Sequence, residues 1–227
     1  MRGRTEAKNG RRDFSLNRWT ATFRRPDRER AFLRQLLPQT QSQLRIALIV
    51  CAVFYVAFAL SDVAVLGYSD KALQLFMARA LVAVAAALGV FALARQPQSI
   101  RAPSVVATAV EVVGMSAFMP VVLHRPHEIP WHAMSMSIML VVVHLFIPNS
   151  FVNATAVSIA TTVVFSLLAI HVGALSVSDT LTMTMLLVLV NTVGIIAAYR
   201  YQCLGRRQFR AQSILRHLSF RDHLTGC

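Results

Sequence analysis

The sequence predicts an all-α membrane protein with six transmembrane helices, and three observations support that fold class. Of the 227 residues, 56% are hydrophobic and only 15% are charged, whereas soluble domains have about a quarter charged residues. Six apolar segments approach or exceed the length of about 20 residues that a bilayer-spanning helix needs. The net charge of +13 lies in the two tails, because residues 46–199 carry five basic and five acidic side chains.

The first 45 residues divide into two predicted segments. Residues 1–25 are polar and basic, so we expect a disordered tail. Residues 26–45 begin with Pro26–Leu37, which reads as a cytoplasmic basic amphipathic helix that Pro38 ends or kinks. The apolar face of this helix consists of Phe32, Leu33, Leu36 and Leu37. That face can lie on the inner leaflet or pack on the cytoplasmic end of the protein itself, and the sequence leaves both possibilities open.

The predicted transmembrane domain, residues 46–199, contains six spans. They are Ile46–Gly67, Leu75–Ala94, Ser104–Leu123, Trp131–Ile147, Phe151–Leu175 and Leu181–Tyr199. The fourth span is short, and the turn Pro148-Asn149-Ser150 that follows it could instead separate two re-entrant halves. We expect both termini to be cytoplasmic, since this orientation places 20 basic residues inside and only Lys71 and Arg125 in the outer loops.

Composition and motifs also limit the partners of the chain. The basic tails flank apolar spans, so their predicted partner is the lipid bilayer. Zinc-finger, helix-turn-helix and aromatic RNA-binding signatures are missing from the sequence, and we expect no nucleic-acid partner. The cysteines Cys51, Cys203 and Cys227 have neither metal nor redox spacing. The first apolar segment begins near Leu44, which does not match a secretory signal peptide.

Charged residues within the spans are candidate sensing residues, because a charge in a bilayer is costly. Asp62 and Arg79 flank a short outer turn at similar depth, so we expect an ion pair that clips this hairpin. Glu111 lies near the middle of the third span, where Arg79 could reach toward it. It can stay protonated, bind a cation, relay a proton or form a hydrogen bond to a neighbouring helix. His144 and Asn191 are expected to form hydrogen bonds between helices.

The outer loop before the fourth span, HRPHEIPWH, contains three histidines and one acidic residue. They are His124, His127, Glu128 and His132. A metal or haem site is the weaker interpretation, because two prolines make a regular i, i+4 presentation of ligands difficult. We expect a polar interfacial loop in which Trp131 marks the membrane boundary.

Residues 200–221, which follow the sixth span, carry an apolar stripe at heptad spacing. The stripe consists of Tyr201, Leu204, Gln208, Ala211, Leu215 and Leu218. Steps of three and four residues are typical of a two-stranded coiled coil, although a short stripe of this kind also suits a solitary amphipathic helix. The sequence therefore predicts a signalling helix that continues the sixth span and joins two copies of the chain in a homodimer.

The final segment, residues 222–227, begins with the motif Asp222-x-Leu224-Thr225-Gly226. This D-x-L-T-G pattern, placed after a helix that leaves a membrane, resembles the opening of a GGDEF domain, the catalytic domain of diguanylate cyclases. Cys227 stands where that family usually has Leu. The resemblance implies that the six spans form the sensor region of a bacterial inner-membrane cyclase, truncated at the domain junction. The missing domain would use GTP and Mg²⁺ to make cyclic di-GMP.

On this resemblance we expect a membrane anchor and signal-input module with neither catalytic activity nor a cofactor in these 227 residues. The outer loops are short, so a stimulus would come from the membrane, from its surface, or as an unknown small ligand in the bundle. One alternative is a small transporter or channel that uses Glu111 and the Asp62/Arg79 pair. Another is a structural membrane protein that pairs with a full-length homologue.

Overall fold

The structure, a computed structural model, describes residues 15–17 and 19–225, with side chains as far as residue 215. Its helices are α2 (Pro26–Ala57), α3 (Ala59–Leu66), α4 (Asp70–Arg95), α5 (Ala102–His124), the short 3₁₀ helix η1 (Pro126–Glu128), α6 (Ile129–Leu145), α7 (Phe151–Val172) and α8 (Val177–Thr225). No extended strand forms within the described ranges. The all-α prediction is confirmed, and six helical stretches are long and apolar enough to cross a membrane.

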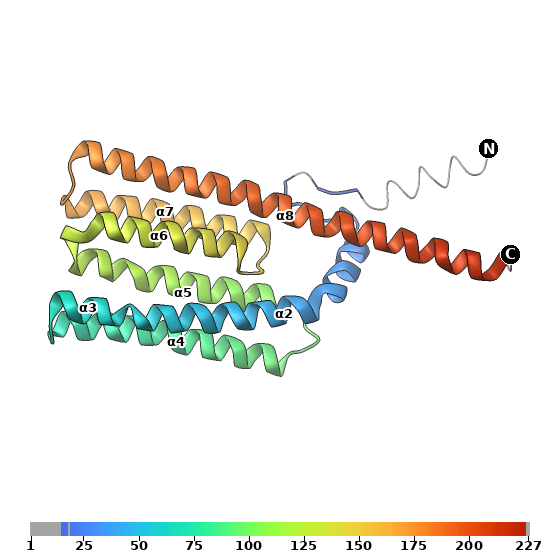
Figure 1. The fold of residues 1–227 in the computed structure, drawn as a ribbon, viewed down its shortest axis with the longest axis horizontal. Helices are drawn as coiled ribbons and strands as arrows, with labels where there is room; N and C mark the ends of the chain where they lie inside the picture. The colour runs from blue at the N-terminus through green and yellow to red at the C-terminus, as the bar shows by residue number, and fades with distance from the viewer. Residues whose placement is uncertain (1–14, 18, 226–227) are drawn as a thin grey trace.

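The helices form an elongated bundle with α5 in the middle (Figure 1). On one side, α5 packs against α4, which in turn packs against α2; on the other side it packs against α7, which packs against α8 and α6. Two apolar cores follow this division. One is centred on Leu44, Leu48 and Leu93, and the other on Met136, Phe165 and Leu187. We call the end where α2 enters the bundle and α8 leaves it the proximal end, and the opposite end the distal end.

Helix α2 joins the predicted amphipathic helix to the first span without interruption. Pro38 lies inside it, and Figure 1 shows that the helix bends between its proximal part and the bundle. A proline inside a helix removes one backbone hydrogen bond and commonly causes such a kink. The break between helices in the first span is at Phe58, between α2 and α3, near the distal end. The first span is therefore two helices with a short joint.

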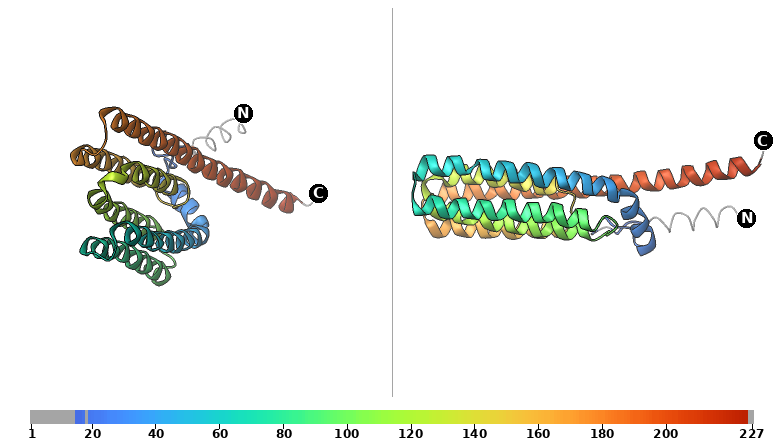
Figure 2. Two further views of the ribbon diagram at one scale, coloured as in Figure 1. Left: turned by 60° about the vertical axis from the view of Figure 1, so that its left-hand side comes forward. Right: turned by 90° about the horizontal axis from the view of Figure 1, so that it is seen from below.

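Helix α8 is a single helix of 49 residues. It begins at the distal end, crosses the bundle, and continues well beyond the proximal end (Figure 2). Its length at 1.5 Å per residue is about 70 Å, roughly twice the thickness of a bilayer core. The predicted sixth span and the predicted signalling helix therefore belong to one continuous element.

The proximal part of α2 packs on α8 rather than standing alone. Phe32 is 5% exposed and meets Phe209 of α8 with ring centroids 5.5 Å apart. Phe23, which precedes α2, completes the group and is also buried. Two of the four residues of the amphipathic face, Phe32 and Leu36, therefore pack on the protein's own proximal end, whereas Leu33 is exposed.

The predicted disordered tail, residues 1–25, lies outside the described residues up to residue 14. Beyond that point the chain folds back on itself. Leu16 and Phe23 form an isolated antiparallel bridge, and Asn17 N donates a hydrogen bond of 2.7 Å to the carbonyl of Thr22. The buried ring of Phe23 gives this segment an apolar anchor, which its basic composition did not suggest.

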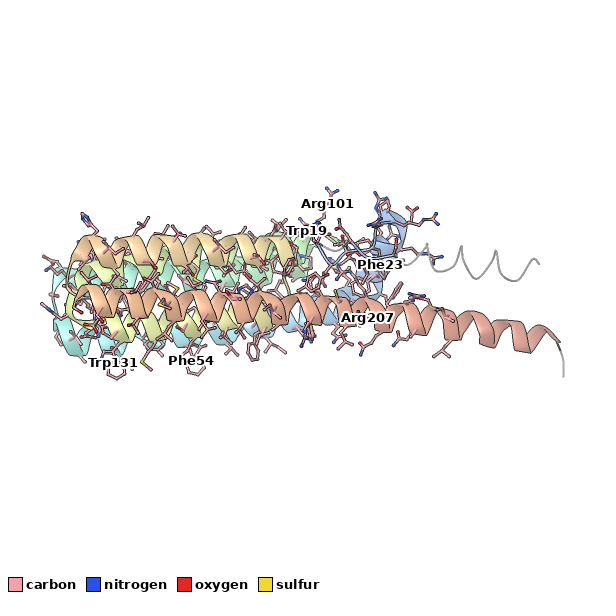
Figure 3. All side chains as sticks on the ribbon, turned by 90° about the horizontal axis from the view of Figure 1, so that it is seen from above. Trp19, Phe23, Phe54, Arg101, Trp131 and Arg207 are labelled. Atoms are coloured by element: carbon pink, nitrogen blue, oxygen red, sulfur yellow. The ribbon has the colours of Figure 1, made fainter. Side chains whose placement is uncertain are left out.

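The outward surface of the bundle is apolar along its length. Large exposed side chains there include Leu60, Leu88, Val105, Ile138, Leu167 and Met185. Trp131 and Phe54 point away from the bundle, whereas Arg101 and Arg207 lie toward the proximal end (Figure 3). Exposed apolar faces of this extent suit a lipid environment. The chain is a multi-pass membrane protein by the length and composition of its helices.

Candidate functional site

The distal end contains a buried ionic cluster centred on Asp62. Arg79 Nε donates to Asp62 Oδ2 over 2.6 Å, and Arg79 Nη2 donates to Oδ1 over 3.1 Å. The two side chains are 1% and 5% exposed. The predicted Asp62–Arg79 ion pair is therefore present, in the two-pronged geometry that gives the strongest arginine–carboxylate contacts.

A second arginine, which the sequence analysis placed in an outer loop, also binds Asp62. Arg125 Nη1 donates to Asp62 Oδ1 over 2.8 Å, and its Nη2 forms an ion pair with Glu128. Arg125 is 7% exposed. It follows directly after the last residue of α5, so its long side chain can turn back into the bundle. The sequence feature that could have predicted this contact is the position of Arg125, one residue past the end of α5 and at the depth of Asp62.

The break at Phe58 helps to hold the cluster together. The carbonyl of Tyr55, in the last turn of α2, accepts a hydrogen bond of 3.1 Å from Arg79 Nη1. Carbonyls in the last turn of a helix lack partners within the helix. Arg79 therefore contacts both halves of the broken span. Since its charges are paired, the cluster is a structural clip that joins α2, α3, α4 and the α5–η1 junction.

A second polar cluster lies between α5, α7 and the turn that joins α6 to α7. Glu111 is 4% exposed, and its Oε2 accepts a hydrogen bond of 2.8 Å from Asn149 Nδ2. Its other oxygen, Oε1, is buried and has no hydrogen-bond partner among the described residues. The sequence analysis allowed a contact with Arg79, but that arginine is bound to Asp62 instead. Asn149 was not among the predicted residues, because the Pro148-Asn149-Ser150 turn was interpreted as a connection between two spans or a break between re-entrant halves, and neither interpretation says where its side chains point.

Hydroxyl and amide groups extend this cluster toward the proximal end. Asn149 Nδ2 also donates to Thr108 Oγ1 over 2.9 Å, and Asn149 Oδ1 accepts from Ser104 Oγ over 2.9 Å. Asn153 Nδ2 donates to Thr108 Oγ1 over 3.1 Å. We call these five residues, Ser104, Thr108, Glu111, Asn149 and Asn153, the carboxylate–amide cluster. It contains the one buried carboxylate of the described bundle that lacks a cationic partner.

The third intramembrane group joins α6, α7 and α8. His144 Nε2 lies 3.4 Å from Asn191 Oδ1, and Asn191 Nδ2 donates to Thr162 Oγ1. Gly194 of α8 lies beside the imidazole, and a Cβ added there would be 2.5 Å from His144 Cδ2. The expected helix-to-helix hydrogen bonds of His144 and Asn191 are thus made to each other. The close fit at Gly194 fixes α8 against α6.

The proximal contact between α2 and α8 combines an ion pair with aromatic packing. Arg206 forms an ion pair with Glu29, its Nε donates to Glu29 Oε2 over 3.1 Å, and its guanidinium lies 4.8 Å from the centre of the Phe32 ring. Gln35 and Gln212 add a hydrogen bond of 3.2 Å. We call this contact the proximal clamp. The sequence did not predict this contact, because Glu29 and Arg206 are 177 positions apart in the chain.

The predicted stripe on α8 lies on the face opposite the clamp. Tyr201, Leu204 and Leu215 are 67%, 53% and 65% exposed, and Gln208 and Ala211 are also exposed. The residues that contact α2, Arg206 and Phe209, are buried. The side chains of Leu218, Asp222, Leu224 and Thr225 lie outside the described residues, as does Gly226.

The three loop histidines are not assembled into a ligand set. His124 Nδ1 lies 2.8 Å from the Pro120 carbonyl oxygen, while His132 Nε2 lies 3.2 Å from the Arg125 carbonyl oxygen. His127 belongs to η1. In the part of the chain that the structure describes, no group of three His, Cys, Asp or Glu side chains is placed to hold a metal ion.

Comparisons with protein-family models, with curated proteins and with solved structures gave no match to this chain. Two features of the described residues bear on its chemistry: a buried carboxylate without a cationic partner, and a long helix that leaves the bundle in contact with a second helix.

Proposed function

We propose that this chain is a membrane signal-input module that controls a cytoplasmic output domain through α8. The observation that carries the proposal is the continuity of α8, which runs from Val177 in the bundle to Thr225 without a break. A helix of this kind passes a rotation or a shift of its membrane part to whatever follows it. We place the proximal end in the cytoplasm, in line with the excess of basic residues there.

The proximal clamp supports a regulated role for α8. Arg206 is 5% exposed and is bound by Glu29 and Phe32 of α2. Helix α8 is thus held by α2 at the point where it leaves the bundle. A rearrangement of the bundle that alters this grip would change the direction of the emerging helix.

The exposed stripe on α8 supports homodimerisation as the mode of output. Tyr201, Leu204 and Leu215 face away from α2 and are more than half exposed, so a second copy can pack there without disturbing the clamp. Introducing a charge at the centre of this stripe, Leu204→Glu, should weaken a coiled-coil contact. We expect this variant to lower cross-linked dimer in membranes, while Arg207→Glu, a charge change at an exposed neighbouring position, leaves dimer unchanged; equal dimer in both variants contradicts the proposal.

The output domain that we propose is a GGDEF domain, on the resemblance of Asp222-x-Leu224-Thr225-Gly226 to the opening of that family. The direct test is the coding sequence beyond the Cys227 codon. We expect it to continue in frame with Asn-Arg and later a GG[DE]EF motif. Expression of that whole reading frame in a bacterial strain without other cyclases should then produce cyclic di-GMP, detected by mass spectrometry. A stop codon or an unrelated continuation would overturn this part of the proposal.

The alternative, a small transporter or channel, draws on the buried and partly unsatisfied Glu111. Reconstituted in proteoliposomes, a transporter would show solute or ion flux that the Glu111→Gln variant loses. The signal-input proposal predicts no flux above that of protein-free vesicles. Flux that depends on Glu111 would therefore favour the alternative.

A further inference from the structure

Glu111 is buried without the charge compensation that the other buried acid receives. Asp62 is bound by two arginines, whereas Glu111 accepts one hydrogen bond, from Asn149, and its Oε1 accepts none from the described residues. An ionised carboxylate in such a place is costly unless it is paired. The same oxygen can instead carry a proton, which removes the charge.

The helices packed on α5 bring several titratable groups, but these groups contact residues other than Glu111. Arg79 of α4 is held by Asp62, and the Tyr55 hydroxyl of α2 donates to the Gly114 carbonyl over 2.8 Å. Of the two histidines on α6, His132 lies beside the Arg125 carbonyl and His144 beside Asn191. The remaining titratable groups on these elements and on α5 itself are Asp27, Arg28, Glu29, Arg30, Arg34, Arg45 and Cys51 of α2, Asp70, Lys71 and Arg95 of α4, His124 of α5, His171 of α7, and His127 and Glu128 of η1. No described residue of this set forms a hydrogen bond or ion pair with Glu111.

The carboxylate–amide cluster provides a polar path from Glu111 to the proximal surface. Ser104, Thr108 and Asn153 are partly buried, and Ser150, whose backbone N–H donates to Asn149 Oδ1, is exposed. Hydroxyl and amide side chains therefore lie between the carboxylate and the exposed proximal turn, and the hydroxyl groups among them can both donate and accept hydrogen bonds. The distal ionic cluster offers no such path, because its charges are already paired.

The same cluster is linked to α8 and to the proximal clamp. The Asn149 carbonyl accepts a hydrogen bond of 3.0 Å from Gln202 Nε2 of α8. The side-chain and backbone oxygens of Gln202 both accept from Arg206 Nη1 over 3.2 Å. Arg206 is in turn the cationic member of the clamp with Glu29. Four consecutive contacts therefore join Glu111 to the contact between α2 and α8.

We propose that Glu111 is a proton-binding site whose occupancy controls the proximal clamp. A proton taken from the proximal solvent forms an O–H bond at the carboxylate, which becomes neutral. The hydrogen bond from Asn149 is then no longer charge-assisted and is weaker. The turn that carries Asn149 is released, its carbonyl withdraws from Gln202, and Arg206 is held less firmly against Glu29. Acidification thus loosens α2 from α8. This inference names the stimulus of the proposed signal-input function and rests on that function for its meaning in the cell.

The test measures the clamp in the whole chain, reconstituted in lipid nanodiscs. Cys51, Cys203 and Cys227 are replaced by Ser, and nitroxide labels are placed on Gln39→Cys of α2 and Ile214→Cys of α8, which are exposed positions beside the clamp but outside its contacts. Labelled chain is diluted with unlabelled chain so that only labels within one copy interact. We expect the dipolar broadening of the EPR spectrum to decrease on acidification, because the two helices separate.

Three further variants decide whether Glu111 is the group that titrates. Glu111→Gln, which matches the neutral acid, should show the weak broadening of the acid state at every pH. Glu111→Asp, which keeps the charge, should retain a pH response. Gln202→Met, which preserves chain length but cannot donate to Asn149, should lose the response with Glu111 intact. An undiminished response in Glu111→Gln, as titration of Glu29 itself would give, or a change that follows sodium at constant pH, would overturn the proposal.

The outcome is separable from that of the proposed function. The clamp could depend on pH although the reading frame encodes no output domain. That result would support the proton site and contradict the signalling role assigned to it. If the clamp did not depend on pH but the full reading frame made cyclic di-GMP, the signalling role would be supported and the proton site contradicted.

Discussion

Asp62 receives arginines from two places in the chain, and this makes it the most tightly bound acid of the bundle. Arg79 comes from the adjacent helix, and Arg125 comes from the far end of α5. A buried ion pair contributes modestly when it is complete, but removal of one partner leaves a buried charge without compensation. Loss of the Asp62 carboxylate leaves Arg79 without an anionic partner, while Arg125 keeps only its ion pair with Glu128.

We therefore predict that Asp62→Ala destabilises the protein by about 3–5 kcal/mol, the range found when one partner of a buried pair is removed. The measurement is unfolding of the purified chain in mixed detergent micelles, followed by circular dichroism. Asp70→Ala is the matched control, since Asp70 is an exposed acid at the start of α4. Similar midpoints for the two variants would show that the cluster does not hold the distal end together.

Gly194 is the residue where α8 comes closest to the imidazole of His144. A methyl group at this position would lie 2.5 Å from Cδ2 and 2.9 Å from Cγ of that ring. We predict that Gly194→Ala destabilises the chain by about 1–3 kcal/mol, as overpacking of a tight core does. Gly114→Ala is the control, because its Cβ would meet only Val82 Cγ1 at 4.0 Å. Thermal melts of both variants against the wild type give the comparison, and an unaffected Gly194→Ala would refute the close contact.

For single residues, the sequence predicts contacts between neighbours in the chain more readily than contacts between residues that are far apart in the chain. Asp62 and Arg79 flank one short turn, so their similar depth in the membrane can be predicted by counting residues from that turn. Arg125 and Asn149 lie at turns, where the side-chain direction depends on how the backbone turns rather than on helical periodicity. Their contacts with Asp62 and Glu111 could be stated only once the structure had set the turns.

The contact between α2 and α8 is the element-scale feature on which the proposed signal-input function depends most. It brings an arginine, an acid and three aromatic rings together at the point where α8 leaves the bundle. The sequence of neither helix identifies the other as its packing partner, because an amphipathic pattern shows that one face of a helix is buried but not which element buries it. The proximal aromatic rings Phe23 and Phe209 are in fact the counterpart of Phe32.

We predict a coupling energy of about 0.5–3 kcal/mol between Glu29 and Arg206, the range for residues in direct contact within one network. The measurement is a double-mutant cycle with Glu29→Gln and Arg206→Gln, read out as unfolding free energy. The cycle of Glu29→Gln with Arg207→Gln is the control, since Arg207 is exposed on the same turn of α8. Additive effects in the first cycle would mean that the ion pair does not contribute to the clamp.

On the scale of the whole molecule, the orientation of the bundle can be tested directly. Tyr68 lies fully exposed in the distal turn between α3 and α4, and Gln98 is exposed in the proximal turn between α4 and α5. In a chain whose native cysteines are replaced by Ser, we predict that Tyr68→Cys reacts with a membrane-impermeant maleimide in intact cells. Gln98→Cys should react only after permeabilisation, because we propose that the basic end faces the cytoplasm. The reverse pattern would invert the topology.

The overall architecture follows from composition to a large extent. Runs of apolar residues separated by short polar turns determine the number of spans, and the number of helices long enough to cross a membrane agrees with the prediction. The internal order of the bundle does not follow in the same way. The middle position of α5 depends on small and polar side chains that meet α4 on one side and α7 on the other, and such packing has no simple period in the sequence.

The two opposite faces of α8 have a genetic consequence. Arg206 and Phe209 face α2 within the same copy of the chain, whereas Tyr201, Leu204 and Leu215 face outward. Changes on the first face should be suppressed by second changes in α2 of the same polypeptide, and so should act in cis. Changes on the second face, if a partner copy packs there, should be complemented by a different allele supplied in trans. A collection of suppressor mutations would then assign the positions of α8 to two classes, one suppressed in cis and one complemented in trans. Positions of the two classes would alternate every three or four codons along the helix.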